Sequence, residues 1–413
     1  MLNKSKLLYL APQNPYPPID GGKISIYYPA VYLARYFDVT LVFPTFESKE
    51  KLKYTEEHFR KYGIEALPFR KNTTNDVTPL MFNFFKKEPF KWDKYYDKEA
   101  QTMINSIVQK RNIKYILVSA PHMAKYALQA KEKFKDLKLF LREHNVEYKL
   151  VEQFKLFTKN PIFKFIAHWQ LKKTKRMEIE YWKKFEKIVF ISDLDLKIAS
   201  EECPDLNDKF MVLYDGFEPI VEEVNKQCIP RNPHFIYTAS LKTIQNKISF
   251  EWFIKKIWMP NFDFIRKHNI KLFVTGNNDE EILKSIKIKS FQDLNIVNLG
   301  FVNNVNEEIL KYKYVLSPTI IGSGLRLKIL NGMACGKIVF TTPLDLTTCN
   351  VFKDMENIVK FETAEDFIQK FLILQKNDDL YIKICSNALK TIKKDFNWDK
   401  YAEILYNLIL VDN

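Results

Sequence analysis

Glycine is scarce in this sequence, at 10 of 413 residues, so each cluster of glycines carries more information than usual. The chain also lacks an uninterrupted run of about 18 apolar residues, the length that a membrane-spanning helix needs. Its five cysteines are scattered without a Cys-x-x-Cys pair, which argues against a zinc site and predicts reduced thiols in the cytoplasm. The first residues, Met1–Leu10, predict a buried strand rather than a signal peptide.

Hydrophobic residues make up 46% of the chain and aromatic residues 15%, which is enough for two large cores. The net charge of +14 is unevenly spread. Residues 1–200 contain 37 Lys and Arg against 22 Asp and Glu, whereas the remainder contains 27 against 28. The basic first half predicts either a solvated, lysine-rich surface or contact with an anionic partner, a nucleic acid or a membrane leaflet.

Short apolar runs rich in β-branched residues alternate with longer, charged segments of helical character. This pattern predicts α/β domains with parallel sheets covered on both faces, and two series of it predict two doubly wound, Rossmann-like domains. In the first half the expected strands are Leu7–Ala11, Val39–Phe43, Tyr115–Ser119, Leu137–Leu141 and Ile188–Ser192. In the second half they are Met211–Tyr214, Phe235–Ala239, Leu272–Thr275, Ile296–Leu299, Tyr314–Pro318 and Ile338–Thr341.

Proline, glycine and acidic residues gather at 213–233, which favours a linker between the domains. We therefore predict an N-terminal domain at 1–212 and a C-terminal domain at 234–395. Residues 396–413 place apolar side chains, including Trp398 and Leu405, at helical spacing. They predict an amphipathic C-terminal helix that packs back across the domain junction.

The most informative loop follows the strand expected at Tyr314–Pro318. It contains Gly322-Ser-Gly and is expected to open a helix near Leu325 that Gly336 ends. A helix N-terminus presents unpaired N–H groups, and glycines let a diphosphate approach them, while Arg326 and Lys328 would add positive charge. The alternative is a turn that serves tight packing alone, and neither the dinucleotide fingerprint nor a P-loop is present.

Two further loops follow expected strands at the sheet edge where α/β proteins bind ligands. Gly21 and Gly22 follow the first strand and precede a helix, which suggests close approach of the backbone to a bound group or a tight turn. His144 follows the strand Leu137–Leu141 among other polar residues. It is our candidate for hydrogen bonding or acid–base chemistry, with a structural histidine as the alternative.

Four motifs in this order resemble glycosyltransferases of family 4, the glycosyl transferases group 1. They are Pro-Tyr-Pro-Pro-Ile-Asp-Gly-Gly at 15–22, His-Asn-Val-Glu at 144–147, Val-Phe-Ile-Ser-Asp at 189–193 and Gly-Ser-Gly-Leu-Arg-Leu-Lys at 322–328. The resemblance implies a GT-B fold, two Rossmann-like domains facing a central cleft. It implies transfer of a sugar from a UDP- or GDP-linked donor, typically with retention and with no cofactor or bound metal, because basic groups and a helix N-terminus stabilise the leaving diphosphate.

The resemblance also implies roles for single residues, with the donor on the C-terminal domain and the acceptor on the N-terminal one. His144 would line the sugar side as the catalytic candidate. Gly21 and Gly22 would approach the donor phosphates. The remaining donor-binding candidates are Lys242, Lys247, Gly322, Ser323, Gly324, Leu325, Lys328 and Asn331.

Many relatives carry glutamates at the positions of Ser323 and Asn331, and the second glutamate usually holds the ribose hydroxyls. Asn331 can still bind a ribose, through a neutral and weaker contact. This departure keeps open a degenerate relative that binds a nucleotide or glycan without catalysis. A nucleotide-sugar epimerase of the same fold also stays open.

Residues 149–187 contain 11 Lys and Arg against 4 Asp and Glu, mixed with aromatic residues. Such helices suit the surface of an anionic membrane, although aromatic residues on helices that cover a sheet are also typical of a core. Our hypothesis is a retaining hexosyltransferase-like enzyme of bacterial cell-envelope polysaccharide synthesis, with a glycan or lipid-linked acceptor and no nucleic-acid partner. We expect it in the cytoplasm or peripherally on the inner face of the plasma membrane.

Overall fold

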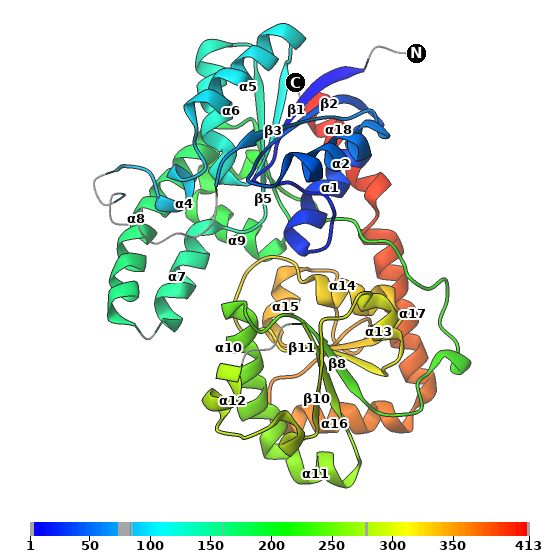
Figure 1. Cartoon of the computed structure of the whole chain (residues 1–413). Helices are drawn as coiled ribbons and strands as arrows, with labels where there is room; N and C mark the ends of the chain where they lie inside the picture. Colours follow the sequence, from blue (N-terminus) through cyan, green and yellow to red (C-terminus); the bar gives the residue numbers. More distant parts are fainter. Residues whose placement is uncertain (1–3, 73–82, 84–85, 159, 277–279, 411–413) are drawn as a thin grey trace. The chain divides into compact units, whose positions relative to one another are not determined.

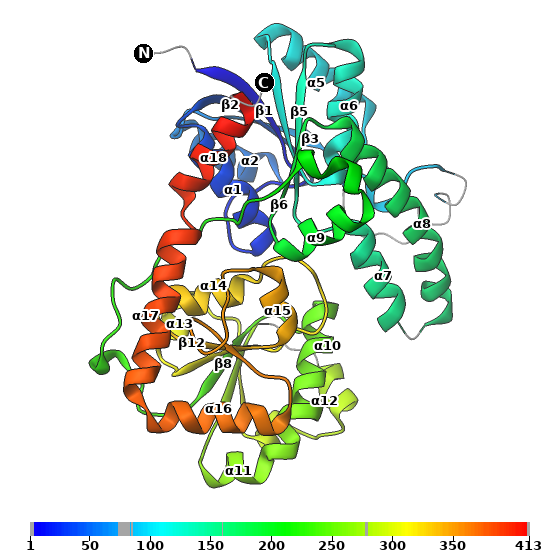
Figure 2. The same cartoon turned by 180° about the vertical axis from the view of Figure 1, so that it is seen from behind.

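The computed structural model describes residues 4–72, 83, 86–158, 160–276 and 280–410. The chain divides into two compact units, each built around one sheet (Figures 1 and 2). The first unit comprises residues 1–215 and 398–413, and the second comprises residues 216–397. The first unit is therefore made of two separate stretches of chain.

The described strands of the first unit form a parallel sheet in the order β3-β2-β1-β4-β5-β6-β7. Their bounds are β1 Ser5–Leu10, β2 Phe37–Thr45, β3 Glu65–Arg70, β4 Tyr115–Ser119, β5 Lys138–Glu143, β6 Lys187–Phe190 and β7 Phe210–Val212. The helices are α1 Gly21–Leu33, α2 Lys49–Arg60, α4 Phe90–Asp93, α5 Lys98–Arg111, α6 Ala124–Lys133, α7 Glu147–Phe157, α8 Pro161–Lys184, α9 Asp193–Glu202 and α18 Trp398–Leu410. The strand order reverses between β1 and β4, and ligands of such sheets bind beyond the strand ends there.

Side chains of the first sheet alternate between two cores, one on each face. Leu8 of β1 packs in a core with residues of α5, α6 and α8, and its neighbour Leu7 packs in another with residues of α1 and α18. Successive side chains of a strand point to opposite faces, so a strand buried on both sides is apolar throughout. This burial on both faces explains the continuous apolar runs from which the strands were predicted.

The described strands of the second unit form a parallel sheet in the order β10-β9-β8-β11-β12-β13. Their bounds are β8 Phe235–Thr238, β9 Leu272–Thr275, β10 Ile296–Gly300, β11 Tyr314–Ser317, β12 Ile338–Thr341 and β13 Val359–Lys360. The helices are α10 Ile244–Phe253, α11 Phe262–Lys267, α12 Glu280–Ile286, α13 Val305–Leu310, α14 Leu327–Ala334, α15 Pro343–Thr348, α16 Ala364–Lys376 and α17 Asp378–Asp395. Here the order reverses between β8 and β11.

Each of the expected strands is present, which confirms the prediction of two doubly wound parallel sheets. One assignment was wrong: the strand expected at Met211–Tyr214 opened the second series, but β7 pairs with β6 in the first sheet, with Ile188 opposite Phe210. Two strands, β3 and β13, were not expected. The described part of the chain contains no helix long and apolar enough to cross a bilayer.

The C-terminal helix α18 packs on α1 within the first unit. The ring of Trp398 stacks on Tyr28 with centroids 5.1 Å apart, and Leu405 is fully buried. Burying a leucine or a larger side chain contributes about 1.5–3 kcal/mol. The amphipathic pattern of residues 396–413 therefore reflects a helix that completes the first core.

Candidate functional site

The loop between β11 and α14 has the strand–loop–helix form that its glycines predict. The helix begins at Leu327, two residues later than expected, with the extended residue Arg326 as its N-cap. It ends as predicted: Gly336 is left-handed, with φ of +62°. The N–H groups of Gly336 and Lys337 bind the carbonyls of Met333 and Gly332 at 3.0 and 2.9 Å, which is a Schellman cap.

Arg326 folds back over the loop that precedes it. Its Nη2 donates to the carbonyl of Ile321 at 3.2 Å. Gly322 has φ of +114°, and a Cβ at that position would overlap the guanidinium group. Glycine is therefore favoured at 322 by the backbone conformation, and a side chain there would displace the guanidinium group of Arg326.

Ser323 adds an unsatisfied group to the same loop. Its side chain is 1% exposed, and its hydroxyl has no hydrogen-bond partner among the described residues. Burying a polar group without a partner costs about 1–3 kcal/mol, so such a group in a native protein calls for a ligand or water. Ser323 was a predicted donor-binding residue, and this orphaned hydroxyl fits that role.

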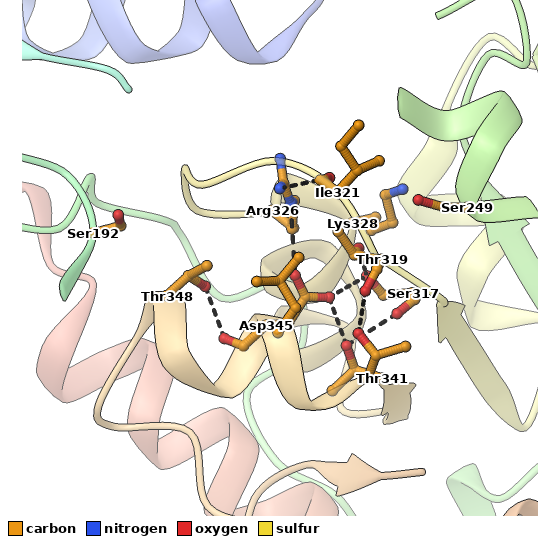
Figure 3. Close-up of polar contacts among 12 residues, drawn as sticks. Ser192, Ser249, Ser317, Thr319, Ile321, Arg326, Lys328, Thr341, Asp345 and Thr348 are labelled. Atoms are coloured by element: carbon orange, nitrogen blue, oxygen red, sulfur yellow. Dashed lines mark hydrogen bonds and ion pairs between the residues drawn. The ribbon is translucent and has the colours of Figure 1, made fainter. Parts of the chain in front are cut away.

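A buried carboxylate, Asp345 of α15, joins the ends of β11 and β12 to Arg326 (Figure 3). Its Oδ2 accepts hydrogen bonds from Ser317 Oγ at 3.0 Å and Thr341 Oγ1 at 2.6 Å. Its Oδ1 lies 3.6 Å from Arg326 Nε. Asp345 therefore orients the guanidinium group. It was not among the predicted site residues, although it follows the end of a strand, which is the feature that pointed to His144.

Lys328 lies in the first turn of α14, close to α10 and β8. Its Nζ donates to Asn246 Oδ1 at 3.2 Å and lies 4.7 Å from the centroid of the Tyr237 ring. Burial, and then the charge of Arg326, lower the pKa of Lys328 to about 7, although Asp345 acts in the opposite direction. An anion bound here would favour the charged amine and raise this pKa.

The other predicted donor-binding residues lie around this start of α14. Lys242 is exposed in the turn before α10, and Lys247 is half-buried in the first turn of α10. Within the contacts described here, Asn246 rather than either lysine meets Lys328. Leu325 is half-buried, and so is Asn331, one turn beyond Lys328 on α14. A shallow pocket at the strand ends is lined by Trp252, Thr319, Ile320, Thr342, Pro343, Leu344 and Glu362.

In the first unit, the glycine pair begins helix α1 as predicted. Asp20 is the N-cap and accepts from the Lys23 N–H at 3.0 Å. The N–H groups of Gly21 and Gly22 belong to the first turn, where no intrahelical acceptor exists. A Cβ on Gly22 would lie 3.0 Å from Gln13 Nε2, so this position is also tightly packed.

A buried arginine, Arg142 at the end of β5, ties α1 to the strand end that precedes His144. Its guanidinium pairs with Asp215 and donates to the Ser25 hydroxyl at 2.8 Å. Ser25 Oγ in turn donates to Asp215 Oδ2 at 2.5 Å. Because Ser25 lies in the first turns of α1, this network fixes the glycine pair relative to the β5 end and to His144.

His144 is held through one ring nitrogen. Its Nε2 lies 2.9 Å from Arg142 Nη1 and 2.8 Å from Ser119 Oγ. Arginine can only donate, so Nε2 accepts and the ring proton resides on Nδ1. Burial, and then the charges of Arg142 and Lys91, lower the pKa of His144 well below its usual value. The ring is therefore held neutral, with an Nδ1–H that can donate a hydrogen bond.

Acidic side chains hold the loop that carries His144. Glu178 of α8 accepts from the N–H groups of Glu147 and Tyr148 at 2.7 and 2.9 Å. Asp195 accepts from the Val146 N–H at 3.0 Å. Burial, and then the neighbouring Glu147, raise the pKa of Glu178 well above its usual value. These acidic side chains accept hydrogen bonds from the backbone N–H groups at the start of α7. Among the described residues, no group of His, Cys, Asp or Glu is arranged to hold a metal ion.

Two Rossmann-like units of this topology define the GT-B class of folds, and solved structures of that class confirm it. HepE from Anabaena, in complex with UDP-glucose, is 11% identical with a TM-score of 0.64, covering 99% of this chain and 100% of HepE. A glycosyltransferase from Rickettsia africae is 15% identical with a TM-score of 0.65 over 100% of both chains. Sucrose-phosphate synthase from Thermosynechococcus elongatus is 10% identical with a TM-score of 0.68, covering 99% of this chain and 100% of that one.

The family-model match lies in the second unit. Residues 232–377 match the family model for glycosyl transferases group 1, which confirms the resemblance over that stretch, including the loop before α14. No curated protein sequence is similar enough to count as a match.

Proposed function

We propose that this protein is a glycosyltransferase that takes a sugar from a UDP- or GDP-linked donor, with retention of configuration and without a bound metal. The observation that carries the proposal is the start of α14, where Arg326, Lys328 and the orphaned hydroxyl of Ser323 gather at the ends of β11 and β12. Departure of the nucleotide builds negative charge on the diphosphate. Preorganised cations and N–H groups stabilise that charge without a metal.

The residues divide into contacts on each unit. In the second unit, the loop Gly322–Leu325, Arg326 and Lys328 would hold the diphosphate, with Asn331 near the ribose and Lys242 and Lys247 as outer basic contacts. In the first unit, Gly21 and Gly22 would offer N–H groups to a phosphate, and the Nδ1–H of His144 would donate to a sugar hydroxyl. We propose a glycan or lipid-linked acceptor and a setting in bacterial envelope polysaccharide synthesis, at the cytoplasmic side of the membrane.

The test is to incubate the protein with a panel of UDP- and GDP-linked sugars in the absence of acceptor and to measure the release of free nucleotide. At least one donor should be hydrolysed slowly, and the released sugar, trapped by methanol and examined by NMR, should keep the anomeric configuration of the donor. Activity should persist in EDTA. A product that is a different nucleotide sugar would instead indicate an epimerase.

Asn331 favours a second candidate, a binding protein without catalysis, because an amide replaces the charged acceptor that relatives use for the ribose. Asn331→Glu separates the two. For a working transferase that tolerates the amide, wild-type protein turns over and the variant only binds the donor more tightly. For a degenerate protein, wild type binds nucleotide in calorimetry but hydrolyses no donor of the panel.

A further inference from the structure

The helical hairpin formed by α7 and α8 exposes a cluster of large apolar side chains at its connecting end. We call this cluster the hairpin tip; its residues are 38–69% exposed and comprise Phe154, Leu156, Phe157, Ile162, Phe163 and Phe165. Figures 1 and 2 show the two helices side by side, with their connecting end away from the first sheet. Single exposed apolar residues are ordinary, but a contiguous group of this kind marks a contact surface.

The base of the hairpin is fixed to the first unit, so the tip is presented by a well-anchored element. Trp182 of α8 is fully buried. Tyr181 stacks on Trp92 with centroids 5.0 Å apart. Gln170 donates to Asn83 Oδ1 at 2.9 Å. The half of α8 near residue 182 therefore belongs to the core, whereas the half near residue 162 extends beyond it.

The charge around the tip has one sign. Between Gln153 and Met177 the sequence contains seven Lys and Arg and no Asp or Glu. Lys164 and Lys172 of α8 are exposed, and Lys155 of α7 contacts His168 across the hairpin at 3.0 Å. The acidic residues of the hairpin, Glu147 and Glu152 of α7 and Glu178 and Glu180 of α8, lie outside this stretch, and Glu152 pairs with Lys149 at 2.7 Å.

This combination decides between possible occupants. A second copy of the tip would bring like charges together, which is unfavourable. A nucleic acid would meet the lysines and stack on the phenylalanines, but it offers no apolar environment to the exposed aliphatic side chains of Leu156 and Ile162. An anionic bilayer accepts both features, because apolar side chains enter the headgroup boundary while lysines meet lipid phosphates.

We propose that the hairpin tip inserts into the headgroup region of an anionic lipid bilayer and docks the protein peripherally. The contact is independent of the sugar-transfer chemistry. Apolar side chains provide the insertion, and Lys164 and Lys172 provide attraction to the surface. The first unit, on which the family resemblance places the acceptor, is then the unit that meets the membrane.

The experiment is co-sedimentation of the full chain with vesicles of phosphatidylglycerol and phosphatidylcholine in equal amounts. We expect wild-type protein to bind these vesicles and to bind vesicles of pure phosphatidylcholine far less. Binding to the anionic vesicles should weaken as the salt concentration rises. The triple variant Leu156→Asn, Ile162→Asn, Phe165→Asn should lose at least about 10-fold in binding. A control triple variant at equally exposed positions, Phe46→Asn, Tyr54→Asn, Phe301→Asn, should bind like wild type.

Lys164→Gln and Lys172→Gln should each weaken binding to the anionic vesicles by about 5-fold. Since both side chains are exposed, these variants test the proposal even where the triple variant folds poorly by circular dichroism. Wild-type protein that ignores anionic vesicles, or a folded triple variant that binds them equally, would overturn it. So would a wild-type dimer in sedimentation velocity that the triple variant abolishes. Donor hydrolysis without vesicles is scored separately and reports on the proposed function alone.

Discussion

At the scale of single residues, Lys328 is the group whose ionisation a ligand should change. Its pKa of about 7 means that a substantial fraction is neutral near neutral pH, and a bound diphosphate would raise that pKa. Binding of UDP or GDP above pH 7 should therefore take up a proton, and affinity should fall as the pH rises from about 7 to 9. Calorimetry in two buffers of different ionisation enthalpy measures the uptake directly.

Lys328→Met should abolish this proton uptake and weaken nucleotide binding about 10- to 100-fold, the loss expected for a hydrogen bond to a charged group. The same change should stabilise the free protein. The unfolded lysine holds its proton up to about pH 10.5, so its burial costs stability that grows as the pH falls from there through about 7. An unchanged buffer dependence of the binding enthalpy in this variant would show that the proton goes elsewhere.

His144 should act as a neutral donor of a hydrogen bond. His144→Ala should reduce transfer by about 100-fold or more while leaving nucleotide binding nearly intact. His144→Asn offers an amide N–H at a similar distance and should recover part of the rate. Because burial and Arg142 lower its pKa, protonation of this ring should not limit the rate near neutral pH. Full activity in His144→Ala would remove it from the site.

The sequence located these residues only in part. Strand ends and glycines pointed to His144, Gly322 and Lys328, because those signals are local. Asp345 and Arg142 were not singled out as site residues, since their roles depend on partners distant in sequence, such as Ser317 for Asp345. Lys242 and Lys247 stay predictions. Their neighbour Asn246 is the residue of this segment that contacts Lys328.

At the scale of elements, the loop before α14 depends on Gly322. Gly322→Ala would strain a left-handed backbone and displace Arg326. Gly300→Ala is the matched control in the same unit, since Gly300 also has positive φ, of +66°, but a Cβ there meets nothing within 4 Å. Each change should cost about 1–2 kcal/mol in stability for its backbone conformation.

Only Gly322→Ala should also weaken nucleotide binding, by at least about 10-fold, because it moves the guanidinium that we propose to contact the diphosphate. Urea denaturation and calorimetry on the two variants give the comparison. If both variants bound nucleotide as wild type does, Arg326 would not be part of the site.

Strands were predicted where burial on both faces makes a continuous apolar run. β3 was missed because this outermost strand of the sheet contains Pro68 and carries charged residues at its ends. β13 has only two residues, too few for any periodic signal. The strand β7 was placed in the wrong series because pairing partners are not visible in a single run of sequence.

At the scale of the whole molecule, the last helix stabilises the first unit. Trp398→Ala should destabilise that unit by about 3 kcal/mol, the cost of removing a buried tryptophan. Trp258→Ala, in the core of the second unit, should shift the unfolding of the second unit instead. Hydrogen exchange measured for individual peptides shows which of the two units each variant destabilises. Equal loss of protection in both units from either change would show that they unfold together.

We propose the start of α14 as the binding site for the diphosphate of a nucleotide sugar. The most direct measurement is release of UDP or GDP from a donor panel, run in parallel on wild type and on Arg326→Met. Wild type should slowly release nucleotide from at least one donor, and Arg326→Met should lose that release. The absence of both hydrolysis and nucleotide binding in the wild-type protein would contradict it.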